Sequence, residues 1–186
     1  MSGSHRVGRP AMAAILLFTV FVAAGCGYTT RSSISNKYKT IRVFPFANKI
    51  DITQEESYIG SKYKIYKPLL ESDITRAVKN RYLLDGNLKP VDRDTADLFL
   101  KGELIDFRRE PLRYTDSDDV AEYRIDVVVN ITLHDKEDKL VWEESHFTGE
   151  FSYFTQGPAA KPESTAITEA ISDLARRIVE RTVEQW

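Results

Sequence analysis

Cys26 is the residue with the most distinctive chemical setting, because it is the only cysteine of the 186-residue chain. It follows a basic leader containing Arg6 and Arg9 and an uncharged run, AMAAILLFTVFV at 11–22, which ends in small residues. This order is typical of an export signal. A helix of twelve residues reaches only about 18 Å of a hydrocarbon core roughly 30 Å thick, which argues against a permanent membrane span. We therefore expect residues 1–25 to be a cleaved signal peptide.

The residues just before the cysteine resemble the lipobox of bacterial lipoproteins, with Ala23 standing where leucine is usual. The resemblance implies that the Cys26 thiol is acylated and becomes the first residue of the mature chain. Two or three acyl chains, at about 0.8 kcal/mol per buried methylene, would anchor the protein stably. By resemblance to the enterobacterial sorting rule, Gly27 permits delivery to the outer membrane, facing the periplasm. The alternative is an ordinary secretory signal followed by a free thiol.

Catalytic or metal-binding chemistry has little support in the sequence. The mature chain has two histidines, His134 and His146, on either side of an expected turn, where strand pairing would keep them apart. No HExxH, GxSxG or GxxxxGK[ST] string occurs. Asp116, Asp118 and Asp119 share a polar loop, for which a solvated turn is favoured over an acid–base pair or a calcium site. We expect a protein that is not an enzyme and that uses no metal and no cofactor.

Composition and charge favour one compact domain and a surface partner other than nucleic acid. The chain is 42% hydrophobic and 29% charged, with a formal charge of −2. It therefore lacks the excess of basic residues with which general nucleic-acid binders neutralise phosphates. Residues 26–50 contain only basic charges, which can lie on anionic headgroups, although a merely solvated tether is an equal alternative. We expect a lipidated tether at 26–38 and a single α+β domain at 39–186.

Hydrophobic periodicity predicts the elements of that domain. A short strand at 41–43 is closed by Pro45 and followed by a long loop at 48–67. Pro68 suits the first position of a helix at 68–84, and Gly86 its end. The later elements follow in order: strands at 97–109, 123–133 and 141–153, a turn at 135–139, and a helix from 167 to the C-terminus.

The expected element order is therefore β-α-β-β-β-α. Two amphipathic helices on one face of a four-stranded, mainly antiparallel sheet would form a two-layer α+β sandwich. The other face of the sheet would stay free, and its third and fourth strands are long compared with the average of about five or six residues. Such strands can project into a partner.

Several short motifs occur in order along the chain: Cys26-Gly27-Tyr28, a strand at 41–46 followed by Ala47-Asn48, Leu70-Glu71, Ala96-Asp97, Gly102-Glu103-Leu104, and a closing amphipathic helix. Together they resemble the LptE family of lipopolysaccharide-assembly lipoproteins. The resemblance implies a non-enzymatic protein that plugs the large outer-membrane β-barrel LptD, helps that barrel assemble, and binds lipopolysaccharide on its way to the outer leaflet. By the same analogy the hairpin at 123–154 supplies much of the plug surface, whereas 58–67 departs from the family pattern.

Lipopolysaccharide carries phosphates on its lipid A, so this ligand calls for Lys and Arg side chains that a strand face presents together. The candidates from the patterning are Lys101, Arg108, Arg109, Arg113 and Arg124. For any single one of them, a solvated surface charge is the favoured alternative. Two other classes of protein stay open: a tethered periplasmic binding module such as an activator of an envelope synthase, and a periplasmic carbohydrate hydrolase, which would need two carboxylates converging in a cleft.

Overall fold

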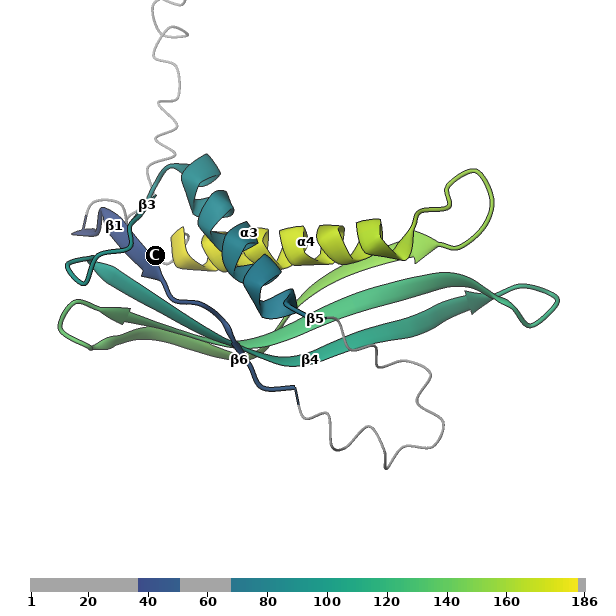
Figure 1. The fold of residues 1–186 in the computed structure, drawn as a ribbon, viewed down its shortest axis with the longest axis horizontal. Helices are drawn as coiled ribbons and strands as arrows, with labels where there is room; N and C mark the ends of the chain where they lie inside the picture. The colour runs from purple at the N-terminus through teal and green to yellow at the C-terminus, as the bar shows by residue number, and fades with distance from the viewer. Residues whose placement is uncertain (1–36, 51–67, 184–186) are drawn as a thin grey trace, which may run out of the picture. The chain divides into compact units, whose positions relative to one another are not determined.

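The structure is a computed structural model, and it describes residues 37–50 and 68–183 (Figure 1). The elements are β1 (Thr40–Val43), β2 (Ala47–Asn48), α3 (Leu70–Asp85), β3 (Lys89–Pro90), β4 (Leu98–Tyr114), β5 (Val120–Asp135), β6 (Leu140–Phe154) and α4 (Glu163–Val183). Cys26, the expected signal peptide, nearly all of the expected tether and residues 51–67 of the expected loop lie outside the described residues.

The strands form one mixed sheet of six strands in the order β3-β1-β4-β5-β6, with β2 also alongside β4. Pairing is parallel where β1 meets β3 and where β1 and β2 meet β4, and antiparallel from β4 through β5 to β6. The expectation of a four-stranded, mainly antiparallel sheet is therefore wrong in size and in type. Two of the strands have only two residues each, which is too short to show the alternation that marks a strand in a sequence.

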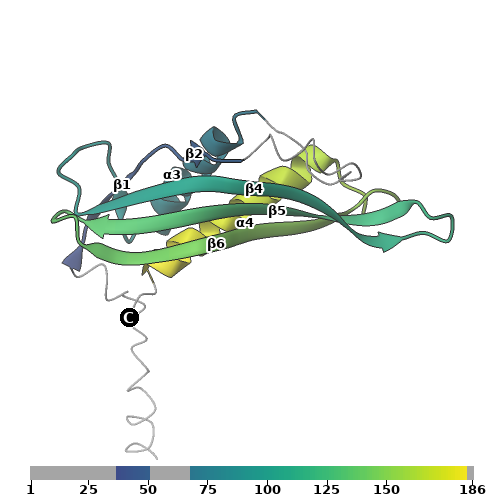
Figure 2. The same cartoon turned by 90° about the horizontal axis from the view of Figure 1, so that it is seen from below.

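Both helices lie on the same face of the sheet, so the expected α+β class is confirmed (Figures 1 and 2). The alternation at 123–133 has the predicted effect: Ile125, Val127, Val129, Ile131 and Leu133 are all buried on the face that meets the helices. α4 packs so closely on β6 that a Cβ added at Gly149 would lie 2.6 Å from Leu174 Cα. The space for this helix therefore depends on a residue without a side chain.

α3 begins two residues later than the sequence predicts. Leu69 precedes it in the left-handed region with φ 65°, so Pro68 is outside the helix rather than its first residue. The predicted stop is confirmed, because Gly86 has φ 76° and its N–H donates to the carbonyl oxygen of Tyr82. The Tyr82 hydroxyl lies 2.8 Å from Thr182 Oγ1 and so joins α3 to α4, and burial raises the pKa of Tyr82.

The length and apolar character of the described helices show whether either could span a membrane. Within residues 37–50 and 68–183, neither helix combines the length and the apolar character that crossing a bilayer requires. In α4 the apolar residues form one stripe that packs on the sheet and on α3, and charged, serine and threonine residues occupy most of the remainder.

Candidate functional site

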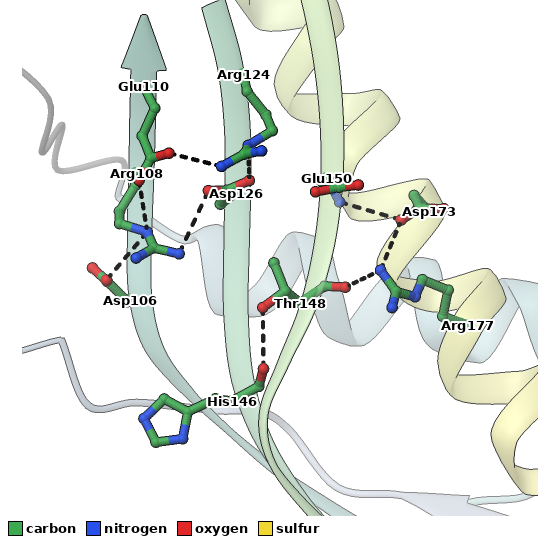
Figure 3. A network of polar contacts seen from close by, with 10 residues as sticks. All are labelled: Asp106, Arg108, Glu110, Arg124, Asp126, His146, Thr148, Glu150, Asp173 and Arg177. Carbon is green, nitrogen blue, oxygen red and sulfur yellow. Dashed lines mark hydrogen bonds and ion pairs between the residues drawn. The ribbon is translucent and has the colours of Figure 1, made fainter. Parts of the chain in front are cut away.

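The candidate site is the face of β4, β5 and β6 that neither α3 nor α4 covers, here called the open face (Figure 2). At its centre Asp126 is flanked by two guanidinium groups (Figure 3). Arg124 Nε lies 3.0 Å from Asp126 Oδ1, and Arg108 Nη2 lies 3.5 Å from Asp126 Oδ2. Arg124 also donates to Glu110 at 2.8 Å. Alternation along antiparallel strands places these side chains on one face, and the strand register sets Arg108 opposite Asp126 and Glu110 opposite Arg124.

Asp126 is the most deeply placed charge of this network. Only 2% of its side chain is exposed. Burial raises the pKa of its carboxyl group, and the nearby guanidinium groups of Arg124 and Arg108 lower it in part. The two arginines remain about a third exposed. The network therefore ties β4 to β5 while both guanidinium groups keep a side open to solvent.

Arg109 lies on the other face of β4. Its guanidinium pairs with Glu163 at 2.5 Å, and it stacks over the ring of Tyr123 at 4.7 Å. Tyr153 lies stacked with Tyr123 and donates to Glu163 at 3.4 Å. Burial, and next the charge of Glu163, raise the pKa of Tyr153 to about 12. This cluster joins three strands to the first turn of α4, and it separates Arg109 from the other predicted phosphate ligands.

The last two predicted ligands lie toward opposite ends of β4. Arg113 pairs with Glu122 at 3.6 Å and lies 5.8 Å from the ring of Phe154. Lys101 is exposed, and its amine lies 5.9 Å from the ring of Phe44. The structure therefore brings Arg108 and Arg124 together and places the other three candidates apart from them. Each of the four arginines has a carboxylate partner.

The outer edge of β6 carries contacts that the sequence analysis missed. Arg177 of α4 donates to the backbone carbonyl of Thr148 at 2.6 Å, and Asp173 accepts from the backbone N–H of Glu150 at 3.2 Å (Figure 3). The signal in the sequence was a pair of opposite charges four residues apart on α4. Their strand partners lie 23 and 29 residues away, so only the fold reveals them.

The two histidines are not brought together. His134 faces Leu140 across the β5–β6 pairing, and the backbone N–H of His146 donates to Asn130 Oδ1 at 3.0 Å. His146 has φ 55° at an irregularity of β6. Asp116, Asp118 and Asp119 are exposed in the turn between β4 and β5. In the part of the chain that the structure describes, no three His, Cys, Asp or Glu residues are grouped to hold a metal ion.

The described residues thus form a two-layer α+β domain with one sheet face that carries paired charges and that the helices leave open. A family model described as lipopolysaccharide-assembly, LptE, matches residues 38–182. The chain therefore belongs to the LptE family, a family of non-catalytic lipoproteins of lipopolysaccharide assembly. No curated protein sequence matches the chain.

Several solved structures resemble the chain at low sequence identity. A minor lipoprotein from Acinetobacter baumannii is 16% identical over 79% of this chain and 91% of its own, with a TM-score of 0.45. The rare lipoprotein B from Shewanella oneidensis is 16% identical over 77% of this chain and 91% of its own, with a TM-score of 0.41. The PelC dodecamer from Paraburkholderia phytofirmans is 13% identical over 81% of this chain and 91% of its own chain, with a TM-score of 0.45. Membership of the family rests on the family model.

Proposed function

We propose that this protein is an outer-membrane lipoprotein that plugs an LptD-type β-barrel, assists its assembly and binds lipopolysaccharide during transport to the outer leaflet. In this proposal residues 1–25 are a signal peptide, and acyl chains on Cys26 hold the tether at 26–38 to the inner leaflet. Residues 39–186 form the domain that enters the barrel.

The open face of β4, β5 and β6 is the observation that carries this proposal. The three strands have 17, 16 and 15 residues. At about 3.3 Å per residue they extend roughly 50 Å, which exceeds the ~30 Å hydrocarbon thickness that a barrel must cross. A ribbon of this length can follow the inner wall of a barrel over its full height, while the helices keep the core closed on the opposite face.

The chemistry of the open face also suits a barrel interior. Outer-membrane barrels are polar inside and apolar outside. Along β5 the open face presents Arg124, Asp126, Asn130, Thr132 and His134. Its charged groups are mostly paired with one another, so the face can meet a polar wall without stripping water from isolated charges.

Lipopolysaccharide binding is proposed at Lys101, Arg108, Arg109, Arg113 and Arg124. Phosphates on lipid A would compete with the local carboxylates for these side chains, because a guanidinium presents a fork of donors that fits either anion. The most exposed of the four arginines is Arg113, with 66% of its side chain accessible. Lys101 is also exposed, and its amine contacts an aromatic ring. We therefore expect these two to contribute first.

Site-specific photo-crosslinking in intact cells tests the plug. A photoreactive residue at Thr132, on the open face, is compared with one at Ser172, an exposed position of α4. The proposal expects a crosslink from Thr132 to a large β-barrel that mass spectrometry identifies, together with copurification of that barrel from detergent. Crosslinks to the barrel from Ser172 alone would place the wrong face at the interface. Recovery of an envelope synthase instead would support the binding-module alternative.

A further inference from the structure

A groove with a volume of about 300 Å³ lies between α3 and α4. Ala77, Arg81 and Leu84 line it from α3, and Ile171 and Ala175 line it from α4. Spacings of three and four residues place each set on one side of its helix. Because an alanine side chain ends at Cβ, Ala77 and Ala175 leave room between the two helices.

The groove has an apolar floor and an exposed apolar wall. Ile171 and Ala175 are 5% and 2% exposed. Leu84 is 81% exposed, which is the largest value among the exposed large hydrophobic side chains of the described residues. A hydrocarbon chain laid against this leucine would remove apolar surface from water, which is favourable in proportion to the area covered. This part of the groove therefore favours an apolar group.

Arg81 gives the groove a cation without a protein partner. Its Nε is buried and has no hydrogen-bond partner, and no described residue forms an ion pair with its guanidinium. The other charged groups of the groove differ, because Arg76 pairs with Asp73 at 2.7 Å. A buried donor without a partner costs free energy, and a carboxylate can accept from two guanidinium N–H groups at once. An anion bound at Arg81 would supply the missing acceptor.

The carboxylates near Arg81 favour a ligand with a single negative charge. Arg81 also lines an adjoining hollow, together with Glu150, Glu169 and Asp173. Asp173 pairs with Arg176, whereas the carboxylates of Glu150 and Glu169 form no ion pair with any described residue. Neighbouring like charges oppose binding of a second anionic group. A ligand with several phosphates is therefore disfavoured here.

The size of the groove favours a small ligand. Pockets that bind small molecules have volumes of about 300–1,000 Å³, and this groove lies at the low end of that range. Ten residues line it, whereas a stable protein interface uses about 20–30 residues on each side. A single hydrocarbon chain suits this volume better than a lipid with several chains or a protein surface.

We infer that the groove binds a single-chain amphiphile of the fatty-acid class, with its carboxylate on Arg81 and its chain between Leu84 and Ile171. The guanidinium donates to the carboxylate, and the chain covers the exposed leucine. This inference goes beyond the proposed function, and it depends neither on a barrel nor on acylation of Cys26.

Calorimetric titration with laurate tests the site. The protein is the chain of residues 26–186 with Cys26→Ala, which cannot be acylated and therefore needs no detergent that would compete for the groove. We expect laurate to bind, and dodecyltrimethylammonium, which has a chain of the same length and the opposite charge, to bind at least about tenfold more weakly. Arg81→Gln should weaken laurate binding by about tenfold or more, because it removes a hydrogen bond between charged groups. Leu84→Ala should weaken it severalfold through lost apolar contact.

The matched control is Asp73→Asn with Arg76→Gln, which removes a paired arginine of the same groove without a change in net charge. This control should change laurate affinity by less than about twofold, since exposed ion pairs contribute little. Arg81→Lys keeps the charge and should keep the preference for laurate over the cationic amphiphile, and thermal unfolding establishes that each variant is folded. The inference is overturned if laurate does not bind, if both amphiphiles bind equally, or if the control weakens binding as much as Arg81→Gln does.

Discussion

Arg177 of α4 donates through Nη1 to the backbone carbonyl of Thr148, and it thereby occupies a hydrogen-bonding position on the outer edge of β6. Asp173 occupies the next position by accepting from Glu150 N–H. An edge strand with free N–H and C=O groups can pair with another chain, so these contacts hinder strand addition at this point. We predict that Asp173→Ala with Arg177→Ala increases self-association, measured by light scattering coupled to size-exclusion chromatography.

The control for this experiment is Arg76→Ala with Asp73→Ala, which removes an ion pair between residues three apart on α3. We expect the control to have the same oligomeric state as the parent protein. Removing either hydrogen bond to the backbone of β6 should also reduce the free energy of unfolding by about 1 kcal/mol. The reduction should be larger for the bond from Arg177, because its donor is charged. An edge variant that remains monomeric at high concentration would show that α4 does not protect β6.

Gly102 and Gly149 both lie too close to a neighbour for a side chain, but the neighbour differs in whether it can move. Gly149→Ala would place a methyl group against the backbone of Leu174, which cannot move without shifting α4. Gly102→Ala would place it against the ring of Phe46, which is a side chain and can turn. We expect both to reduce the free energy of unfolding by about 1–3 kcal/mol, as overpacked cores do. Phe46→Leu should restore part of the loss at Gly102 and none at Gly149, as measured by denaturant unfolding.

The fold was predictable where apolar residues repeat over many positions. Apolar residues alternate along β5 and recur every three or four residues along α4. These patterns predict the two elements because each one repeats at least three times. The pairing of Lys89–Pro90 with Thr40 and Ile41 was not predictable, since a two-residue strand has no period and its partner lies far away in the chain. The sheet is mixed because β1, β2 and β3, with four residues or fewer each, make all of its parallel pairings among the described residues.

The candidate site was predictable only as a set of residue types. Patterning selects Arg109 as a basic residue of a strand, but its partner Glu163 lies 54 residues away at the start of α4. An irregularity between Leu104 and Asp106 also shifts the alternation, so Arg108 rather than Arg109 occupies the open face. A periodic pattern carries no information about such a shift, and the division of the arginines between two faces therefore required the structure.

The pH dependence of stability should separate two aspartates. Asp97 Oδ2 accepts from the backbone N–H groups of Lys39 and Thr40, each at 2.9 Å, and these bonds lower the pKa of Asp97. A lowered folded pKa gives stability that is present above the unfolded value of about 4 and is lost as the pH falls through the folded pKa. Asp97→Asn should therefore cost about 1–3 kcal/mol at pH 7, and less in acid.

Asp126 should behave in the opposite way, because burial raises its pKa. The stability that Asp126 contributes through this shift is present below about pH 4 and is lost as the pH rises through the pKa of Asp126 in the folded protein. Asp126→Asn imitates the protonated form, so we expect a smaller loss at pH 7 than for Asp97→Asn and a flatter stability curve above pH 4. Urea unfolding of both variants between pH 4 and pH 7 measures the loss at pH 7 and the shape of each stability curve. A loss at pH 7 as large as that of Asp97→Asn would show that the ion pairs with Arg108 and Arg124 outweigh burial.

The candidate phosphate ligands should differ in their effect on lipid A binding. Lys101→Ala and Arg113→Ala remove exposed charges, and at about 1 kcal/mol per basic residue each should weaken binding roughly fivefold. Arg109→Ala should instead reduce the free energy of unfolding, since Arg109 pairs with Glu163 and stacks on Tyr123. The matched control is Arg76→Ala, an arginine of α3 with a 72% exposed side chain. Binding is measured by displacement of a fluorescent lipid A analogue at two salt concentrations, because screening reduces exposed charge contacts most. If Arg76→Ala weakens binding as much as Lys101→Ala and Arg113→Ala do, the contribution of the strands is one of net charge alone, and the assignment of ligands to β4 is wrong.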